Sequence, residues 1–173
     1  MNSEKLCEKA LAELAEGNTD ALSVIYGEMS RRIFSLAYTV TGNYCDAEDV
    51  LQNTMIDITR SCRGFHGGSA AAWIMTVARH NALDVVRKRR EGAETELYDA
   101  DIVVVQAQND SFAALEVLDM LSVLDEDEKQ IVLLRLYQKM PYCEIAAVMG
   151  IKVFAAQKRY QRAISKLKKY NAR

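Results

Sequence analysis

One uninterrupted stretch, Trp73–Arg90 (WIMTVARHNALDVVRKRR), constrains the fold of this chain more than any other. It contains no proline and no glycine, which predicts a single long helix. Ile74, Ala78, Ala82 and Val85 recur at the spacing of one helix face, so they predict a buried stripe against neighbouring elements.

The same stretch carries cations on a different side. Arg79, Arg87 and Arg90 follow the helical repeat, and Lys88 and Arg89 join them. A helix with an apolar face, a basic face and a tryptophan near its start is typical of a nucleic-acid-binding surface. The alternative interpretation is a solvated basic end that complements the negative end of the helix dipole.

Charge is segregated along the chain, although the formal net charge is only −2. Positions 91–128 hold twelve Asp and Glu residues and no Lys or Arg, whereas positions 152–173 hold eight Lys and Arg residues and no acid. Phosphate binding depends on local charge, so the near-neutral total does not exclude a nucleic-acid partner. The acidic stretch could also fold back on the basic 152–173 helix and mask it.

Half of the residues are hydrophobic, enough for one compact domain or two small ones. Glu4, Glu8 and Glu13 interrupt any export signal, and no apolar run approaches the about 20 residues of a membrane span. We therefore expect a cytoplasmic protein without a membrane span.

The four cysteines are scattered, at positions 7, 45, 62 and 143, and form no CxxC pair. Cys62 and His66 have a zinc-like local spacing but lack a second ligand pair. Reduced thiols are therefore expected, and no metal site.

Three helices are predicted before the basic one. Ser3–Glu16 forms the first and stops at Gly17, Thr19 can cap a second over Ala21–Val40, and Asp46 opens the third. After a glycine-containing turn, Ser69 can cap the basic helix.

The third helix has two different faces. Its inner face is apolar, with Ala47, Val50, Leu51, Thr54 and Ile58. Its outer face mixes an acid, amides, an isoleucine and an arginine: Asp49, Gln52, Asn53, Ile56 and Arg60. This outer face is either ordinary solvent surface or a docking surface for another protein.

From Glu91 to Asp110 the chain turns acidic and loses helical periodicity, which predicts a linker. The IVVV run at 102–105 is unusual for a linker. It is either a short extended segment packed on a neighbour or an insert into a partner's channel.

Helical periodicity resumes at Ser111, and Asp125 and Glu128 have capping-box spacing. Pro141 suits the start of a short helix, Gly150 suits the turn after it, and a basic amphipathic helix follows over Val153–Tyr170. Short helix, glycine turn and basic helix form the helix-turn-helix pattern, whose second helix enters the major groove. The chain is thus predicted to be all-α, with two small helical domains joined by an acidic linker.

Four segments resemble an RNA polymerase sigma factor of the extracytoplasmic-function (ECF) group of the sigma-70 superfamily. They are DAEDVLQNTM at 46–55, WIMTVARHNALDVVRKRR, LSVLDEDEKQIVLLRLYQKMPYCEIAAVMGI and RYQRAISKL. The resemblance implies sigma region 2 over residues 1–91, a linker over 92–110 and sigma region 4 over 111–173.

The resemblance implies a specificity subunit that binds core RNA polymerase and promoter DNA, without catalysis, cofactor, metal or small-molecule substrate. It also implies an anti-sigma partner, and a linker that threads toward the active cleft of the polymerase. The implied polymerase-binding residues are Asp49, Gln52, Asn53 and Ile56. Those implied for the minus-ten element are Trp73, Arg79, His80, Asn81, Arg87, Lys88, Arg89 and Arg90. Those implied for the minus-thirty-five element are Lys152, Phe154, Gln157, Lys158, Arg159, Arg162 and Lys166.

The chain departs from the family pattern at three places. His80 precedes Asn81 where an Asn is usual, so minus-ten preference is expected to differ and to be pH-sensitive. Phe154, Ala155 and Ala156 stand where a hydroxyl usually begins the recognition helix, and Met55 replaces a customary Phe.

Two other functions compete with the sigma factor. One is a stand-alone helix-turn-helix regulator that binds duplex DNA as a dimer. The other is a degenerate sigma-like protein retained for protein interaction. An enzyme is the least favoured class, because the two histidines form no triad and the chain has no Gly-rich phosphate loop.

Overall fold

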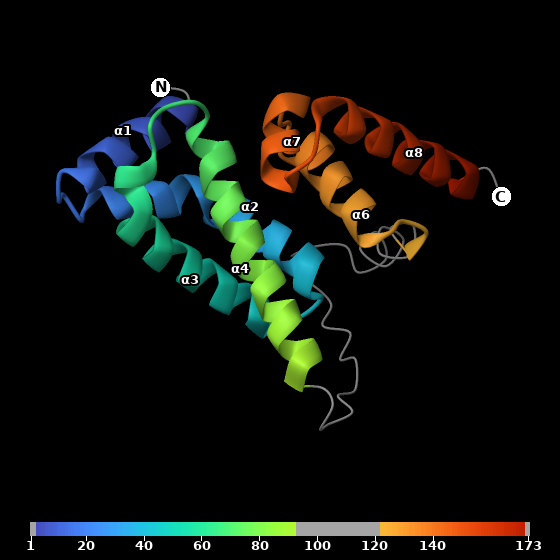
Figure 1. Ribbon diagram of the computed structural model, residues 1–173, viewed down its shortest axis with the longest axis horizontal. Coiled ribbons are helices and arrows are strands. Elements are labelled where there is room, and N and C mark those ends of the chain that lie inside the picture. The colour runs from blue at the N-terminus through green and yellow to red at the C-terminus, as the bar shows by residue number, and fades with distance from the viewer. Residues whose placement is uncertain (1–2, 93–121, 172–173) are drawn as a thin grey trace, which may run out of the picture.

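The computed structural model describes residues 3–92 and 122–171, and these ranges contain helices and turns but no strand. The first range holds α1 (Ser3–Ala15), α2 (Ala21–Thr41), α3 (Tyr44–Ser61), the short turn η1 (Cys62–Gly64) and α4 (Ala70–Gly92). The second holds α6 (Glu126–Val132), the π-helical turn η2 (Leu133–Tyr137), α7 (Tyr142–Met149) and α8 (Val153–Asn171). The all-helical prediction is confirmed (Figure 1). Glu91 and Gly92, predicted to begin the linker, instead end α4; the rest of the predicted linker and the helical pattern from Ser111 to Leu121 lie outside the described residues.

The helices α1 to α4, the first lobe, pack around the stripes that the sequence predicts. The α2 helix buries Ile25, Met29, Ile33 and Leu36 completely. On α4 the predicted stripe is confirmed, because Ile74, Ala78 and Ala82 are buried and Val85 is partly buried. This packing orients the opposite sides of α3 and α4 away from the core of the first lobe.

The predicted start of α2 at Ala21 is confirmed, but its predicted cap and the predicted start of α3 are wrong. Thr19 does not cap α2: Asp20 occupies the N-cap position, and no side chain caps this helix. The α3 helix begins before Asp46, at Tyr44, because the side chain of Asn43 accepts a hydrogen bond of 3.0 Å from the backbone N–H of Asp46. The Asp46 carboxylate is therefore available for a partner elsewhere.

The other predicted caps are confirmed. The Ser69 hydroxyl accepts a 3.1 Å hydrogen bond from the N–H of Ala72. Asp125 and Glu128 form the complete, reciprocal capping box. Gly150 ends α7 with φ +65°, a left-handed conformation that glycine adopts without a Cβ clash.

The elements α6, η2, α7 and α8, the second lobe, contain the predicted helix-turn-helix. Ala156, Ala163 and Leu167 of α8 are buried, as the pattern predicts. Tyr160 packs edge-on against Tyr142 of α7, with ring centroids 5.8 Å apart. These contacts fix α8 across α7 and leave Lys158, Arg162 and Lys169 exposed.

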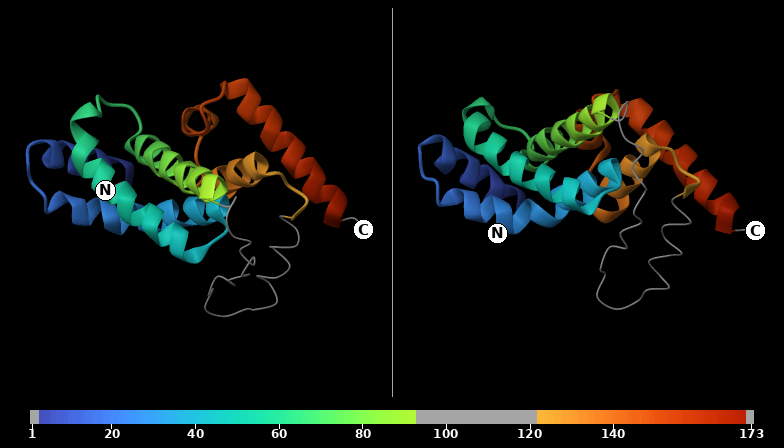
Figure 2. Two further views of the ribbon diagram at one scale, coloured as in Figure 1. Left: turned by 60° about the horizontal axis from the view of Figure 1, so that its bottom comes forward. Right: turned by 90° about the horizontal axis from the view of Figure 1, so that it is seen from below.

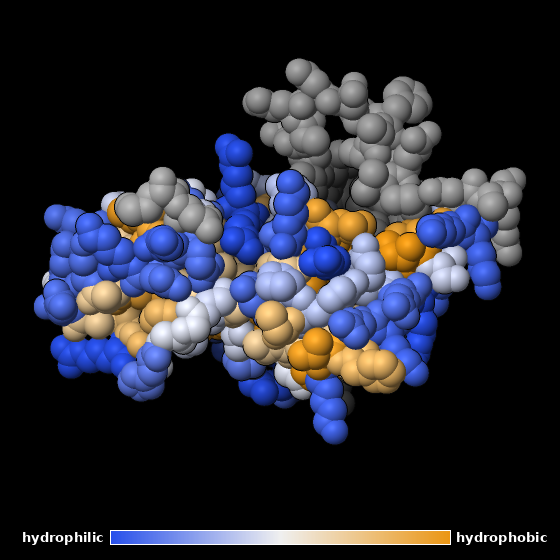
Figure 3. All heavy atoms as spheres, turned by 90° about the horizontal axis from the view of Figure 1, so that it is seen from above, coloured by the Kyte–Doolittle hydropathy of each residue, from blue (hydrophilic) through white to orange (hydrophobic). Residues whose placement is uncertain are grey.

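The two lobes pack against each other, with α4 along α7 and α2 against α6 (Figures 1 and 2). One apolar cluster runs through both lobes and includes Met75 of α4 with Ile131, Leu134 and Ile145 of the second lobe. The face seen in Figure 3 is mostly hydrophilic, with smaller apolar patches between the charged side chains. No helix within residues 3–92 and 122–171 is long and apolar enough to cross a bilayer.

Candidate protein-docking and nucleic-acid interfaces

The outer face of α3 is open to solvent. Asp49, Gln52, Asn53 and Ile56 are all exposed, and none of their side chains hydrogen-bonds or ion-pairs with another described residue. The opposite side of the helix supplies the buried residues Ala47, Val50, Thr54 and Ile58. A helix anchored on one side and unpaired on the other presents these side chains in a fixed arrangement.

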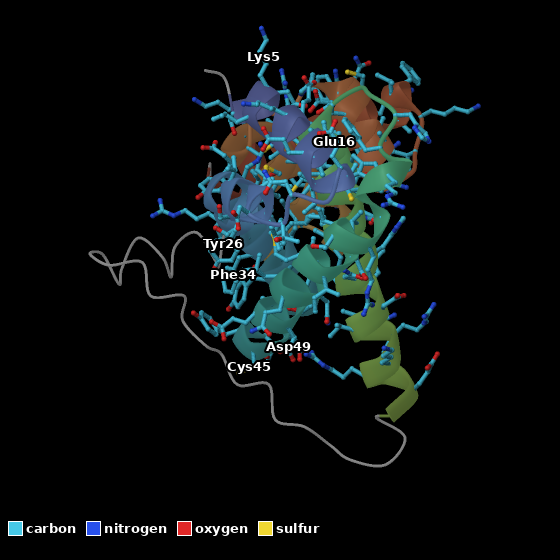
Figure 4. All side chains as sticks on the ribbon, turned by 90° about the vertical axis from the view of Figure 1, so that its left-hand side faces the viewer. Lys5, Glu16, Tyr26, Phe34, Cys45 and Asp49 are labelled. Carbon is cyan, nitrogen blue, oxygen red and sulfur yellow. The ribbon has the colours of Figure 1, made fainter. Side chains whose placement is uncertain are left out.

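A groove between the start of α2 and the middle of α3 extends this face. Tyr26, Leu22 and Met55 line it together with Gln52 and Ile56. The side chains of Tyr26 and Ile56 are 53% and 47% exposed. Tyr26 (Figure 4) was not predicted as part of this surface, although an aromatic residue outside the buried stripe of α2 is a signal for one.

Two side chains in the first half of α4 that were predicted to contact DNA make contacts within the first lobe. Trp73 is half-buried against Phe65, with ring centroids 5.8 Å apart. Asn81 is half-buried, and its amide donates hydrogen bonds to Thr54 Oγ1 (3.3 Å) and Asp57 Oδ2 (3.0 Å) of α3. His80, between them in sequence, is exposed.

The carboxy-terminal half of α4 presents its cations unequally. Arg87, Lys88 and Arg90 are exposed, although Arg87 pairs with Asp84 on the same helix at 3.1 Å. Arg89 instead ion-pairs with Asp46 at the start of α3 and donates a 3.2 Å hydrogen bond to the carbonyl of Thr41. Arg89 thus fastens the end of α4 to its own lobe.

Arg79 lies between the lobes. Its side chain is only 13% exposed, its Nε donates a 2.8 Å hydrogen bond to Gln130 Oε1, and its Nη2 lies 3.8 Å from Asp127 Oδ1. Burial lowers the pKa of the guanidinium, and the Asp127 carboxylate opposes that shift. Of the predicted cations on α4, Arg79 is the one with an ion pair and a hydrogen bond to described residues of the second lobe.

The start of α8 carries an exposed aromatic–cation pair. The Phe154 side chain is 65% exposed, and Lys158 Nζ lies 4.7 Å from its ring centroid. Lys152 and Arg162 are also exposed, whereas Gln157 is half-buried. Phe154 is one of the residues that depart from the hydroxyl-containing start of the family pattern, and its ring presents a stacking surface instead of a hydrogen bond.

Two further cations of α8 are paired with acids of α6. Arg159 ion-pairs with Asp127, and Lys166 Nζ lies 2.6 Å from Glu128 Oε2. These two ion pairs bring the last acids of the 91–128 stretch onto α8; the rest of the predicted fold-back falls on residues 93–121, outside the described residues. Which cations Asp127 and Glu128 would bind was not predicted, because these partners are far away in sequence.

The thiols and the zinc-like pair show no shared site. Cys62 is buried and its thiol donates to the Thr59 carbonyl at 3.4 Å, whereas His66 is exposed. In the part of the chain that the structure describes, no group of three His, Cys, Asp or Glu side chains could hold a metal ion. Burial, with Glu28 and Glu4, raises the pKa of the Cys7 thiol to about 11.

Comparison with known families places two regions in the chain. Residues 25–92 match sigma-70 region 2, and residues 114–167 match sigma-70 region 4. The chain is 31% identical over 149 residues to the ECF RNA polymerase sigma factor SigE of Mycolicibacterium smegmatis, covering 82% of this chain and 58% of SigE. It is 29% identical over 157 residues to the RNA polymerase sigma factor CarQ of Myxococcus xanthus, covering 88% and 90%.

Solved structures share this fold. One is the sigma factor RpoE in complex with the anti-sigma factor NepR from Bartonella quintana, with a TM-score of 0.73, 20% identity, and coverage of 83% of this chain and 92% of that one. Another is CnrH in complex with the cytosolic domain of CnrY, with a TM-score of 0.74, 21% identity, and coverage of 99% and 98%. At this level of identity the likeness concerns the fold.

Proposed function

This chain belongs to the extracytoplasmic-function group of the sigma-70 family, and we propose that it binds core RNA polymerase and directs the enzyme to promoters. The observation that carries the proposal is the presence of both sigma regions, in order, in one chain. A stand-alone regulator needs the helix-turn-helix but not the preceding lobe. The subunit we propose has no catalysis of its own and works in the cytoplasm, where polymerase meets chromosomal DNA.

The proposed polymerase contact is the outer face of α3 with its groove. Asp49, Gln52, Asn53 and Ile56 supply an acid, two amides and an apolar centre, and the exposed ring of Tyr26 widens the surface. An apolar centre inside a polar rim is the composition of a protein interface. The lack of internal partners on this face means that docking breaks no intramolecular hydrogen bond or ion pair among the described residues.

The proposed minus-ten surface lies on α4. Arg87, Lys88 and Arg90 are placed to bind phosphates, and exposed His80 is placed to reach a base. Unstacking a base costs a few kcal/mol, which a pocket and nearby cations must offset. Trp73, Arg79, Asn81 and Arg89 belong to the proposed surface as well, but in the described arrangement each has a packing or polar partner within the chain.

The proposed minus-thirty-five surface lies on α8. Lys152, Lys158 and Lys166 suit phosphates, whereas Gln157 and the arginines Arg159 and Arg162 can read base edges. Glutamine matches adenine and arginine matches guanine in a bidentate way in the major groove. Phe154 offers an apolar contact suited to the methyl group of thymine.

An anti-sigma factor is the further partner we propose. Two proteins with this fold, RpoE of Bartonella quintana and CnrH, are each in complex with another chain: RpoE with the anti-sigma factor NepR, and CnrH with the cytosolic domain of CnrY. An anti-sigma partner of this chain would act by covering one or more of the three proposed surfaces.

The test is run-off transcription with purified chain, core polymerase and fragments of the host genome. We expect specific transcripts that depend on both proteins, and DNA binding that is strong only with polymerase present. A solution dimer that binds a palindromic site tightly without polymerase would instead support the stand-alone regulator. Absence of a transcript from every promoter, including those upstream of its own operon, would refute the sigma assignment.

A further inference from the structure

Polar contacts join the two lobes in addition to their shared apolar cluster. Arg32 Nε donates to Gln138 Oε1 at 3.3 Å, and Gln138 Nε2 donates back to the Arg32 carbonyl at 3.1 Å. Burial raises the pKa of the Glu144 carboxyl on α7, and an interaction with the Ser69 hydroxyl, just before α4, opposes that shift. The described arrangement is therefore a specific docking of the lobes and not a loose approach.

The third polar contact involves the DNA-binding surfaces themselves. One carboxylate, Asp127 of α6, lies within ion-pair distance of Arg79 on α4 through Oδ1 and of Arg159 on α8 through Oδ2. Gln130, one turn further along α6, accepts a hydrogen bond from the same Arg79. A single acid thus connects the helix proposed for the minus-ten element with the helix proposed for the minus-thirty-five element.

Promoter geometry is incompatible with this connection. The two elements lie roughly 25 base pairs apart, or about 85 Å of helix axis at about 3.4 Å per base pair. Arg79 and Arg159 share one carboxylate, so they cannot lie at both elements together. The segment 93–121 would span roughly 100 Å if fully extended, so chain length does not prevent the lobes from separating.

We propose that Asp127 is a clasp that holds the free chain in a closed, DNA-incompetent arrangement by binding Arg79 and Arg159, and that opening exchanges this carboxylate for DNA. The proposal rests on the proposed function, because it takes α4 and α8 to be the DNA-binding helices. It gives Asp127 a regulatory role that none of the three proposed surfaces includes.

The physical character of the clasp suits a reversible switch. The Asp127 side chain is 44% exposed, so its ion pairs are screened by salt and open to competition from phosphates. The apolar contacts of Met75 with the second lobe remain when the clasp is removed. Loss of Asp127 therefore shifts the ratio of closed to open molecules and does not abolish the closed form.

The native cysteines allow a direct test on the full chain. Cys45 on α3 and Cys143 on α7 are exposed, one in each lobe, whereas Cys7 and Cys62 are buried. Spin labels on the two exposed thiols report the distance between the lobes by double electron–electron resonance. We expect a dominant short distance for the wild-type chain at low salt, and a longer component that grows with salt.

The variants are D127N, which removes the charge, and D127R, which repels both arginines. The matched control is E126Q on the preceding residue, since Glu126 pairs with Lys129 on its own helix. We expect the fraction of long distances to rise several-fold in D127N and further in D127R, and to stay at the wild-type value in E126Q. Circular dichroism verifies that helix content is unchanged, as expected for a half-exposed side chain.

Identical distance distributions for wild type, D127N and D127R would overturn the clasp, as would a wild-type chain that is already open. A second readout is the affinity of the isolated chain for a random-sequence 40-base-pair duplex. We expect D127N to bind about three- to tenfold more tightly than E126Q at low salt, with a difference that narrows as salt screens the clasp. These readouts need no polymerase. If the variants shift the distances as expected but run-off transcription fails, the proposed sigma function is refuted and the clasp is not. If transcription succeeds but the variants leave the distances unchanged, the clasp alone is refuted.

Discussion

The outer face of α3 differs from the cationic faces of α4 and α8 in how many of its side chains already bind other residues of the same chain. On α3, Asp49 and its neighbours have no polar partner among the described residues. On the cationic helices, Arg79, Arg89, Arg159 and Lys166 all bind acids of the same chain. The proposed protein-docking surface is therefore preformed, whereas the proposed DNA-binding surfaces are partly paired with acids of the same chain.

The difference suggests an order of events. A preformed surface binds without breaking internal contacts, whereas a self-paired surface must exchange its partners first. Polymerase is then expected to bind before DNA, and DNA binding is expected to be weak until the lobes separate. The following predictions test this contrast, from the largest expected effect to the smallest.

The largest effect is expected on polymerase binding, from a substitution on the outer face of α3. Ile56→Arg places a charge at the apolar centre of the α3 face, where the side chain is 47% exposed and its replacement leaves the core intact. We expect affinity for core polymerase to fall at least tenfold, since central apolar residues dominate interface energies at roughly 2 kcal/mol or more. Surface plasmon resonance with immobilised core enzyme measures it.

The control for this variant is Ser61→Arg, which adds the same charge to the exposed last residue of α3, away from the face. Equal binding by Ile56→Arg and wild type would remove the α3 face from the docking hypothesis.

Two neighbouring arginines of α4 are expected to differ in role: Arg89 stabilises the lobe, whereas Arg90 is available for the proposed DNA contact. Arg89→Ala removes the Asp46 ion pair and the Thr41 hydrogen bond, so we expect the free energy of unfolding to fall by about 1 kcal/mol. Arg90→Ala, one residue along, removes an exposed cation and should leave stability within about 0.5 kcal/mol. Urea denaturation measures both, and equal destabilisation by the two variants would contradict the assignment of Arg89 as a fastener.

Substituting two arginines of α8 compares an exposed cation with one that is ion-paired within the chain. Arg162 is exposed, whereas Arg159 must leave Asp127 before it binds DNA. In the isolated chain we expect Arg162→Ala to weaken duplex binding by about 1 kcal/mol and Arg159→Ala by less, because the latter also loosens the closed form. Fluorescence anisotropy at several salt concentrations tests this order, and a larger loss for Arg159→Ala would reverse the comparison.

The smallest effect is a change in thiol reactivity. Cys45 is exposed one helical turn before Asp49, so polymerase on the α3 face should slow its alkylation several-fold. Cys7 should react slowly with or without polymerase at pH 8, because burial and nearby carboxylates raise its thiol pKa to about 11 and leave little thiolate. Mass spectrometry after timed iodoacetamide treatment measures both, and unchanged Cys45 labelling in the complex would argue for a different docking surface.

The helices and their faces were largely predictable from the amino acids. The stripe Ile74, Ala78 and Ala82, the capping box of Asp125 and the left-handed Gly150 all follow from local spacing and residue chemistry. The α3 start was misplaced because Asn43 and Asp46 are both competent caps, and the choice depends on what else each side chain binds.

What the sequence determined by itself was which helices form, which side of each is apolar and which is charged, since these depend on residues three or four positions apart. What only the tertiary structure decided was which charges remain available. Asp46 meets Arg89, and Asp127 meets both Arg79 and Arg159, across separations that no periodicity encodes. The physical reason is that ion pairing depends on distance in space, and packing of the two lobes sets that distance.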